Sequence, residues 1–163
     1  MFTRNHVRRS TRPWRTSALV LGVTVGALLL AEPALAAHWG PLSSSYKGKV
    51  RVQGEGDFYK YQGAYARSTM KITDKSNDGN NVYGKTQFQF YRVTTGSSSP
   101  SWIVSATKST PEHAGAGVAR TTSLQVGLRG DADRARGVTQ ACAQMGWPVP
   151  DSCSDSAYTT FSY

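Results

Sequence analysis

Polar and apolar residues alternate with a period of two along much of the chain after residue 48. Gln87-Phe88-Gln89-Phe90 is the clearest case, and residues 49–53 and 68–73 repeat the pattern. Successive side chains of a β-strand point to opposite faces of a sheet, so this alternation predicts strands with one buried face. Stretches rich in Gly, Ser, Asn and Asp separate the runs and predict turns.

The predicted strands extend from residue 49 to residue 163, without a long amphipathic helix. Turn signals recur about every 8–12 residues, a spacing typical of β-sandwiches. We therefore predict an all-β domain over residues 49–163, a single antiparallel β-sandwich of about seven strands. Residues 139–145 have a composition that also suits a short helix. The strand-forming runs are residues 49–53, 58–65, 68–73, 82–93, 102–107, 119–128, 138–143 and 157–163.

Residues 37–48 show little periodicity. They contain Gly40, Pro41 and a run of serines over residues 43–45. We interpret residues 37–48 as a flexible N-terminal tail, because short terminal segments with few apolar residues are seldom held in a fold. An edge segment of the sheet is the alternative over residues 37–45.

Residues 1–36 have the organisation of a cleavable signal peptide. An arginine-rich start precedes an uncharged apolar stretch, and Ala34-Leu35-Ala36 supplies small residues for cleavage before Ala37. The apolar stretch holds about 13 residues, whereas a membrane-spanning helix needs about 20. An uncleaved anchor is the alternative. We expect a secreted, extracellular protein without a stable membrane anchor. Polar residues 10–12 after the Arg8-Arg9 pair favour the general secretory route.

Much of the positive charge belongs to this leader. The chain has 19 Lys and Arg and 10 Asp and Glu residues, a formal net charge of +9. The leader holds five of the basic residues and one acidic residue, Glu32, which leaves 14 basic and 9 acidic residues and a charge near +5. A basic surface attracts acidic proteins, anionic envelopes and polysaccharides. No run of Lys and Arg resembles a nucleic-acid patch, so we expect no nucleic-acid partner.

Cys142 and Cys153 lie in the exported part of the chain, where thiols usually form disulfides. The pair predicts one C-terminal bridge closing a loop of about 12 residues, worth on the order of 3 kcal/mol. Pro148 and Pro150 make this loop stiff, so Trp147 would lose little entropy on binding a partner. The loop therefore suits recognition. The alternative is that Trp147 packs inward and the bridge only fixes the last strand.

An aromatic run over residues 58–65 places rings on both faces of one predicted strand. One face belongs to the core. Tyr59 and Tyr61, on the other face, are suited to contact a sugar or a protein. The alternative is an ordinary strand with half-exposed tyrosines.

Catalytic patterns are weak. His38 and His113, the histidines after residue 36, belong to no nucleophile motif. Glu55 and Asp57 would lie on one strand face about 7 Å apart, as a carboxylate pair does, but no other residues form a sugar cleft with them. We expect no catalytic residue, no cofactor and no metal.

Two short motifs have simpler explanations as turns. Residues 74–79 place oxygen-bearing side chains at the first, third and fifth positions of a calcium loop, but Lys85 stands where the twelfth position needs Glu. We expect a hairpin turn here, with calcium binding as the alternative. Arg129-Gly130-Asp131 matches an adhesion tripeptide by letter, and a hairpin turn accounts for the same residues.

Two features resemble the adaptor subunit of umbrella toxin particles, among the small secreted β-domain proteins of actinobacteria. They are the tail His38-Trp39-Gly40-Pro41-Leu42 and the single bridge around Trp147-Pro148-Val149-Pro150. In that family a small secreted protein links a lectin-like subunit to the stalk of a large toxin, and its N-terminal extension inserts into a cleft of the lectin. The resemblance implies a non-enzymatic role in competition between bacteria, with the tail as an interaction element.

We therefore expect a secreted, non-catalytic binding or adaptor protein. One alternative is a protease inhibitor that presents the disulfide-braced loop with Met145, Gly146 and Trp147. Another is a protein that binds carbohydrate or the cell envelope through Tyr59 and Tyr61. The residues expected to contact a partner are His38, Trp39, Pro41, Leu42, Tyr59, Tyr61, Trp147 and Pro148.

The leader generates a direct prediction. N-terminal sequencing of the secreted protein is expected to start at Ala37, give or take one residue, because the small residues at positions 34 and 36 mark the cleavage site. Recovery of the full-length chain from the membrane fraction would contradict it.

Overall fold

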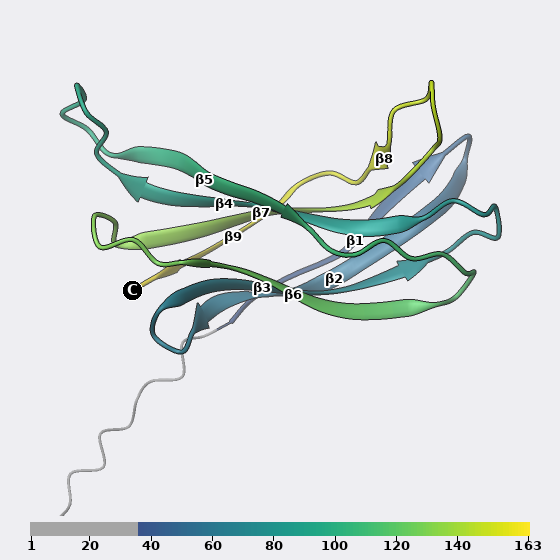
Figure 1. The fold of residues 1–163 in the computed structure, drawn as a ribbon, viewed down its shortest axis with the longest axis horizontal. Coiled ribbons are helices and arrows are strands. Elements are labelled where there is room, and N and C mark those ends of the chain that lie inside the picture. Colours follow the sequence, from purple (N-terminus) through teal and green to yellow (C-terminus); the bar gives the residue numbers. More distant parts are fainter. Residues whose placement is uncertain (1–35) are drawn as a thin grey trace, which may run out of the picture. The chain divides into compact units, whose positions relative to one another are not determined.

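The alternating runs become strands of two antiparallel sheets packed face to face in the computed structural model, which describes residues 36–163 (Figure 1). Sheet A has the strand order β1-β2-β3-β6, and sheet B has the order β5-β4-β7-β8, with β9 also paired to β7. Within the described residues, no helix is long and apolar enough to cross a membrane. The strands are β1 (Ala37–Tyr46), β2 (Lys49–Tyr61), β3 (Tyr65–Asp74), β4 (Val82–Arg92), β5 (Ser101–Ser109), β6 (Ala119–Gly127), β7 (Arg134–Ala143), β8 (Ser152–Cys153) and β9 (Ala157–Ser162).

The all-β antiparallel prediction is confirmed, including its disulfide between Cys142 and Cys153. The first two predicted runs merge into β2, while β1 and the two-residue β8 are additional strands. Residues 139–143, which also suited a helix, belong to β7. The predicted signal peptide lies outside the described residues except for Ala36.

Strand β1 corrects the prediction of a flexible tail. Residues 37–46 pair with β2 along sheet A, and Trp39 is only 3% exposed. The register shifts between Trp39 and Leu42, and this irregularity hides the alternation in the sequence. Gly40 within the shift has a φ of +94°, and a Cβ there would lie 2.7 Å from the carbonyl oxygen of Gly54. The edge segment, given as the alternative, is the correct interpretation.

Glycines on sheet B face large side chains on sheet A. A Cβ on Gly137 of β7 would lie 2.8 Å from the ring of Phe58 in β2, and one on Gly84 of β4 would collide with the sulfur of Met70 in β3. Phe58 and Met70 are fully buried. Since protein interiors are close-packed, the absent side chains provide the space that lets the two sheets approach.

Two apolar clusters form the core and meet at a chain of buried hydroxyl groups. Thr86 Oγ1 lies 3.1 Å from Ser68 Oγ and 3.2 Å from Thr139 Oγ1. All three side chains are fully buried, and their mutual hydrogen bonds link β3 of sheet A to β4 and β7 of sheet B. One cluster contains Trp39, Val52, Met70, Ile72, Val82, Ala141 and Ala143, and the other contains Phe58, Ala66, Phe88, Phe90, Ala135 and Phe161.

The burial of Trp39 generates a prediction. Trp39→Ala is expected to lower the free energy of unfolding by about 3–5 kcal/mol, because it removes a large buried ring and leaves a cavity. Urea unfolding measures the change. His38→Ala, on the exposed face of the same strand, is the control and is expected to stay within about 0.5 kcal/mol of the parent protein. Equal stability of the two variants would show that β1 is not part of the fold.

Candidate binding site at the Trp147 loop

The loop between β7 and β8, residues 144–151, carries a tryptophan in solvent. Trp147 is 97% exposed, and Pro148 beside it is exposed as well. The loop projects beside β8 at one end of the sheets (Figure 1). The interpretation that Trp147 packs inward is therefore wrong. A fully exposed indole is unusual for a residue type that is highly buried on average.

Several contacts hold the base of this loop. The disulfide joins Cys142 and Cys153, which face each other across the β7–β8 ladder. Met145 packs against the first core cluster, and Ser152 Oγ lies 2.7 Å from Ser44 Oγ of β1. The loop is thus anchored to both sheets, while its tip is left free.

A tyrosine–carboxylate hydrogen bond adds to this anchoring. The hydroxyl of Tyr83 in β4 donates to Asp151 at 2.7 Å. Burial, together with this hydrogen bond and the nearby negative charge of Asp151, raises the pKa of Tyr83 to about 12. The raised pKa means that the protonated tyrosine stabilises the fold. This contribution is complete below the ordinary tyrosine pKa near 10 and disappears as the pH rises through about 12.

The tip of the loop is a tight turn. Val149 N–H donates to the carbonyl of Gly146 at 2.9 Å, which closes a turn around Trp147 and Pro148. The turn and the anchored base restrict the backbone that carries the indole. An aromatic side chain on such a support buries a large area against a partner at a small entropy cost.

Basic and aromatic groups lie beside the loop. The carbonyl of Ser45, near the end of β1, accepts a hydrogen bond from Ser152 Oγ at 3.3 Å, so the β1–β2 turn is adjacent. Lys47 in this turn is exposed, and its Nζ lies 5.3 Å from the ring centroid of Tyr46. The base of the loop therefore carries charges of both signs, with Lys47 in the adjacent turn and the carboxylates of Asp151 and Glu112 bonded to Tyr83 and Gln144, as interfaces with polar rims do.

The acidic residues of the turn at residues 74–79 bond to the protein itself. The two carboxylate oxygens of Asp74 accept hydrogen bonds from Ser76 N–H at 2.9 Å and Gly115 N–H at 2.8 Å. Asp78 pairs with Arg51. Between residues 36 and 163, no group of three or more His, Cys, Asp or Glu side chains is arranged to hold a metal. Asp74 thus connects the loops over residues 75–81 and 110–118, and Asp78 fixes the first of these loops to β2.

The residues of the predicted tail do not gather with Trp147. His38 is exposed on the outer face of sheet A, with Nδ1 3.1 Å from Asp57. Trp39 is in the core, which corrects its assignment as a partner anchor. Leu42 packs partly against the same cluster, and Pro41 is exposed beside a shallow polar pocket.

Tyr59 and Tyr61 of β2 are half-buried, as in the alternative interpretation of an ordinary strand with half-exposed tyrosines. Tyr59 and Tyr61 both lie on the outer face of sheet A, with ring centroids 6.4 Å apart. The guanidinium of Arg67 lies 3.1 Å from the centroid of Tyr61 and covers one ring face. On the same face Glu55 pairs with Lys71 at 3.2 Å. Since Asp57 pairs with His38, the two carboxylates have separate partners.

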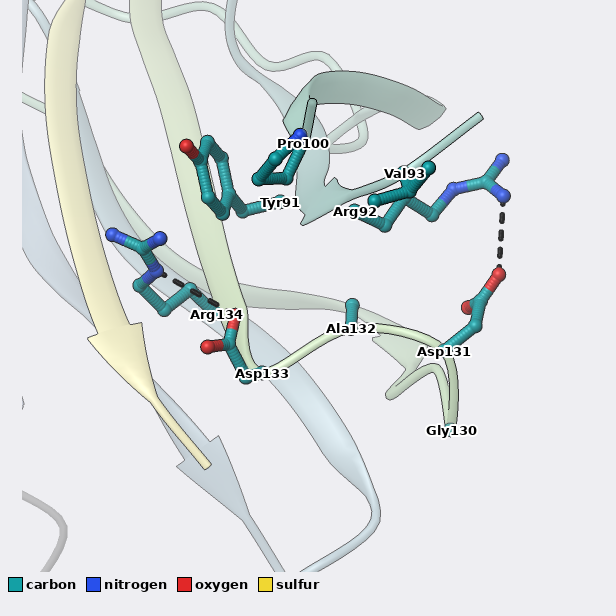
Figure 2. Close-up of a pocket in the computed structure, with 9 residues that line it drawn as sticks. All are labelled: Tyr91, Arg92, Val93, Pro100, Gly130, Asp131, Ala132, Asp133 and Arg134. Atoms are coloured by element: carbon teal, nitrogen blue, oxygen red, sulfur yellow. Dashed lines mark hydrogen bonds and ion pairs between the residues drawn. The ribbon is translucent and has the colours of Figure 1, made fainter. Parts of the chain in front are cut away.

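A pocket lies at the end of β4 and β7 that is remote from the Trp147 loop. This open pocket has a volume of about 480 Å³, and Tyr91, Pro100 and Arg134 lie along it (Figure 2). The tripeptide at residues 129–131 borders it. Arg129 donates two hydrogen bonds to Asp131, which lower the pKa of that carboxyl group. The tripeptide therefore pairs with itself in a turn.

Sequence reasoning missed the residues that support the loop. Tyr83 of β4 contacts Asp151 in the loop and Ser44 of β1 contacts Ser152 beside it, and no local pattern marks such long-range contacts. Sequence reasoning also missed the stacked aromatic and basic residues of sheet B, which are Tyr91 with Arg134 and Trp102 with Arg136. The signal available for them is the absence of Asp and Glu from residues 82–92, 101–109 and 134–143.

No protein-family model and no curated protein matches this chain. Two solved structures are similar to it at low levels. Selenomethionine-labelled β-glucosidase from Kluyveromyces marxianus has a TM-score of 0.37 and 11% identity, over 69% of this chain and 13% of that chain. The β-glucosidase from the same organism in complex with glucose has a TM-score of 0.38 and 14% identity, over 71% of this chain and 14% of that one. The chain thus spans a small part of these structures, and the similarity carries no argument about function.

The disulfide at the base of the loop generates a prediction. The intact secreted protein is expected to weigh about 2 Da less than the fully reduced chain, and reduction is expected to lower its stability by on the order of 3 kcal/mol. Mass spectrometry and thermal unfolding with and without a reductant measure the two effects. Two free thiols titrated in the native secreted protein would contradict the bridge.

Proposed function

We propose that this protein is a secreted, non-catalytic binding protein that recognises another extracellular protein through the Trp147 loop. The observation that carries the proposal is the 97% exposure of Trp147 on a loop that is anchored at its base. Buried tryptophans are frequent energetic centres of protein interfaces, and anchoring reduces the entropy that binding removes.

Secretion is supported by two independent features. The first 36 residues have the organisation of a signal peptide, and the disulfide indicates an oxidising environment. In this proposal the loop meets its partner outside the cell.

The resemblance to the adaptor subunit of umbrella toxin particles supplies a finer form of the proposal. In that form the protein joins a lectin-like subunit to a large antibacterial toxin. Strand β1 pairs with β2 along its length and buries Trp39, so it is not free to insert into a partner's cleft. The proposed docking element is therefore the loop at residues 144–151.

The turn at the loop tip argues against a protease inhibitor. An inhibitor of the substrate-like kind offers extended backbone to pair with the enzyme as a strand does. Here Gly146 and Val149 already bond to each other, and Met145 packs against the core. The loop instead presents one side chain, which favours recognition of a pocket on the partner.

The proposal generates a prediction. Trp147→Ala is expected to abolish capture of the secreted partner from spent culture medium, since loss of a central tryptophan costs about 2 kcal/mol or more. Its unfolding free energy is expected to stay within about 0.5 kcal/mol of the parent value, because the ring is exposed. Mass spectrometry of the captured proteins gives the readout.

Tyr65→Ala is the matched control, since Tyr65 is also an exposed aromatic residue and lies in the β2–β3 hairpin of sheet A. Equal capture by the parent protein and both variants would remove the Trp147 loop as the binding element.

A further inference from the structure

The strands of sheet B have an unusual charge distribution. Strands β4, β5, β7, β8 and β9 contain no Asp or Glu. Arg92 pairs with Asp131, and Lys108 donates to the carbonyl of Gln125. The other basic residues of these strands are Lys85, Arg134 and Arg136.

Two of these cations are held over aromatic rings on the outer face of the sheet. The guanidinium of Arg134 lies 3.9 Å from the ring centroid of Tyr91. That of Arg136 lies 4.4 Å from the centroid of Trp102 and 5.4 Å from that of Tyr158. Stacking on the rings fixes the orientation of each guanidinium and leaves its edge for hydrogen bonds. On Arg136, Gln89 takes up part of that edge.

The charge of Arg136 has no carboxylate partner among the described residues. Its Nε and one terminal nitrogen donate to the neutral amide oxygen of Gln89, at 2.9 and 2.5 Å. Arg134 has only Asp133, at 3.5 Å. On the outer face of sheet A, in contrast, Lys71 pairs with Glu55 at 3.2 Å. The strands of sheet B thus carry five basic residues and no acidic one, whereas those of sheet A carry six basic and three acidic residues.

Hollows lie at both ends of this stacked row. One is the pocket that contains Tyr91 and Arg134 and is also lined by Asp131 and Asp133, which pair with Arg92 and Arg134 (Figure 2). The other has a volume of about 400 Å³, and Lys85, Gln140 and Tyr158 lie along it. The stacked residues are Tyr91, Arg134, Trp102, Arg136 and Tyr158. Tyr91 and Arg134 line the first hollow and Tyr158 lines the second, so the stacked residues and the two hollows form one strip along β4 and β7.

We propose that this strip binds a linear polysaccharide whose sugars carry carboxylate groups, a function beyond recognition through the Trp147 loop. Oriented guanidinium groups match carboxylates in two-pronged hydrogen bonds. The amide nitrogen of Gln87 and the amide oxygen of Gln140 remain to donate to and accept from sugar hydroxyl groups, since the other atom of each amide already bonds Gln89 or Ser154. The ring of Tyr158, which is 64% exposed, is free to pack against the apolar face of a sugar.

The same features disfavour other polyanions. Nucleic acids bind through open aromatic platforms on which bases stack, whereas guanidinium groups lie over Trp102 and Tyr91. An acidic polypeptide supplies carboxylates but few hydroxyl groups for the amides. The strip therefore suits a charged glycan best.

The test is calorimetric binding of the secreted protein to polygalacturonate, with neutral dextran as the ligand control. The parent protein is expected to bind polygalacturonate and not dextran. Arg136→Gln is expected to weaken binding by about tenfold or more, because it removes hydrogen bonds to a charged group. Arg120→Gln, the same change at an exposed position of β6, is expected to alter affinity by less than about twofold.

Tyr158→Ala removes an exposed ring, so it tests the strip even if Arg136→Gln does not fold, and it is expected to weaken binding as well. Absence of binding by the parent protein would overturn the proposal, as would equal losses in Arg136→Gln and Arg120→Gln. Binding of poly-glutamate or single-stranded DNA with the same affinity and the same dependence on Arg136 would also overturn it. Trp147→Ala is expected to retain full affinity for polygalacturonate, which separates this surface from the loop.

Discussion

The close approach of the two sheets depends on glycines at inward positions of sheet B. Gly84 and Gly137 leave room for Met70 and Phe58, and Ala141 in turn lies against Gly54 of β2. These contacts fix β7 against sheet A, since a larger residue at Gly137 would meet a fully buried ring. Cys142 follows Ala141 directly, so the packing of the sheets also positions the cysteine from which the braced loop departs. The fold and the candidate site thus depend on the same inter-sheet contacts.

The sequence pattern was sufficient for the fold class, and it was least informative where the chain departs from regular alternation. The pattern predicts a tail where strand β1 lies, because the irregularity around Gly40 and Pro41 interrupts the period of two. The disulfide could be predicted from the sequence, because the chain has two cysteines, which allow one pairing, and both follow an expected secretory leader. Whether Trp147 points inward depends on the shape of a turn and on contacts with Ser44 and Tyr83, which are distant in sequence.

Both proposed binding surfaces involve β7; the strip follows the strand from Arg134 to the hollow at Gln140, and the Trp147 loop leaves it after Ala143. The strand pairs with Val82 at the end that leads into the Trp147 loop, and with Tyr91 at the end that carries Arg134. A partner held by the loop would therefore leave the face around Arg136 uncovered. This separation is the geometry that an adaptor requires, because such a protein must hold two different partners without making them compete.

The division of the loop into an anchored base and a free tip has an evolutionary consequence. The residues that stabilise the loop, among them Cys142, Cys153 and Met145, are different from the residue that it displays. Mutations at position 147 are therefore expected to be nearly neutral for folding, so that in the proposed function selection on them acts through binding alone. A lineage carrying this framework is free to diversify its specificity quickly at the tip, since new variants keep the same marginal stability.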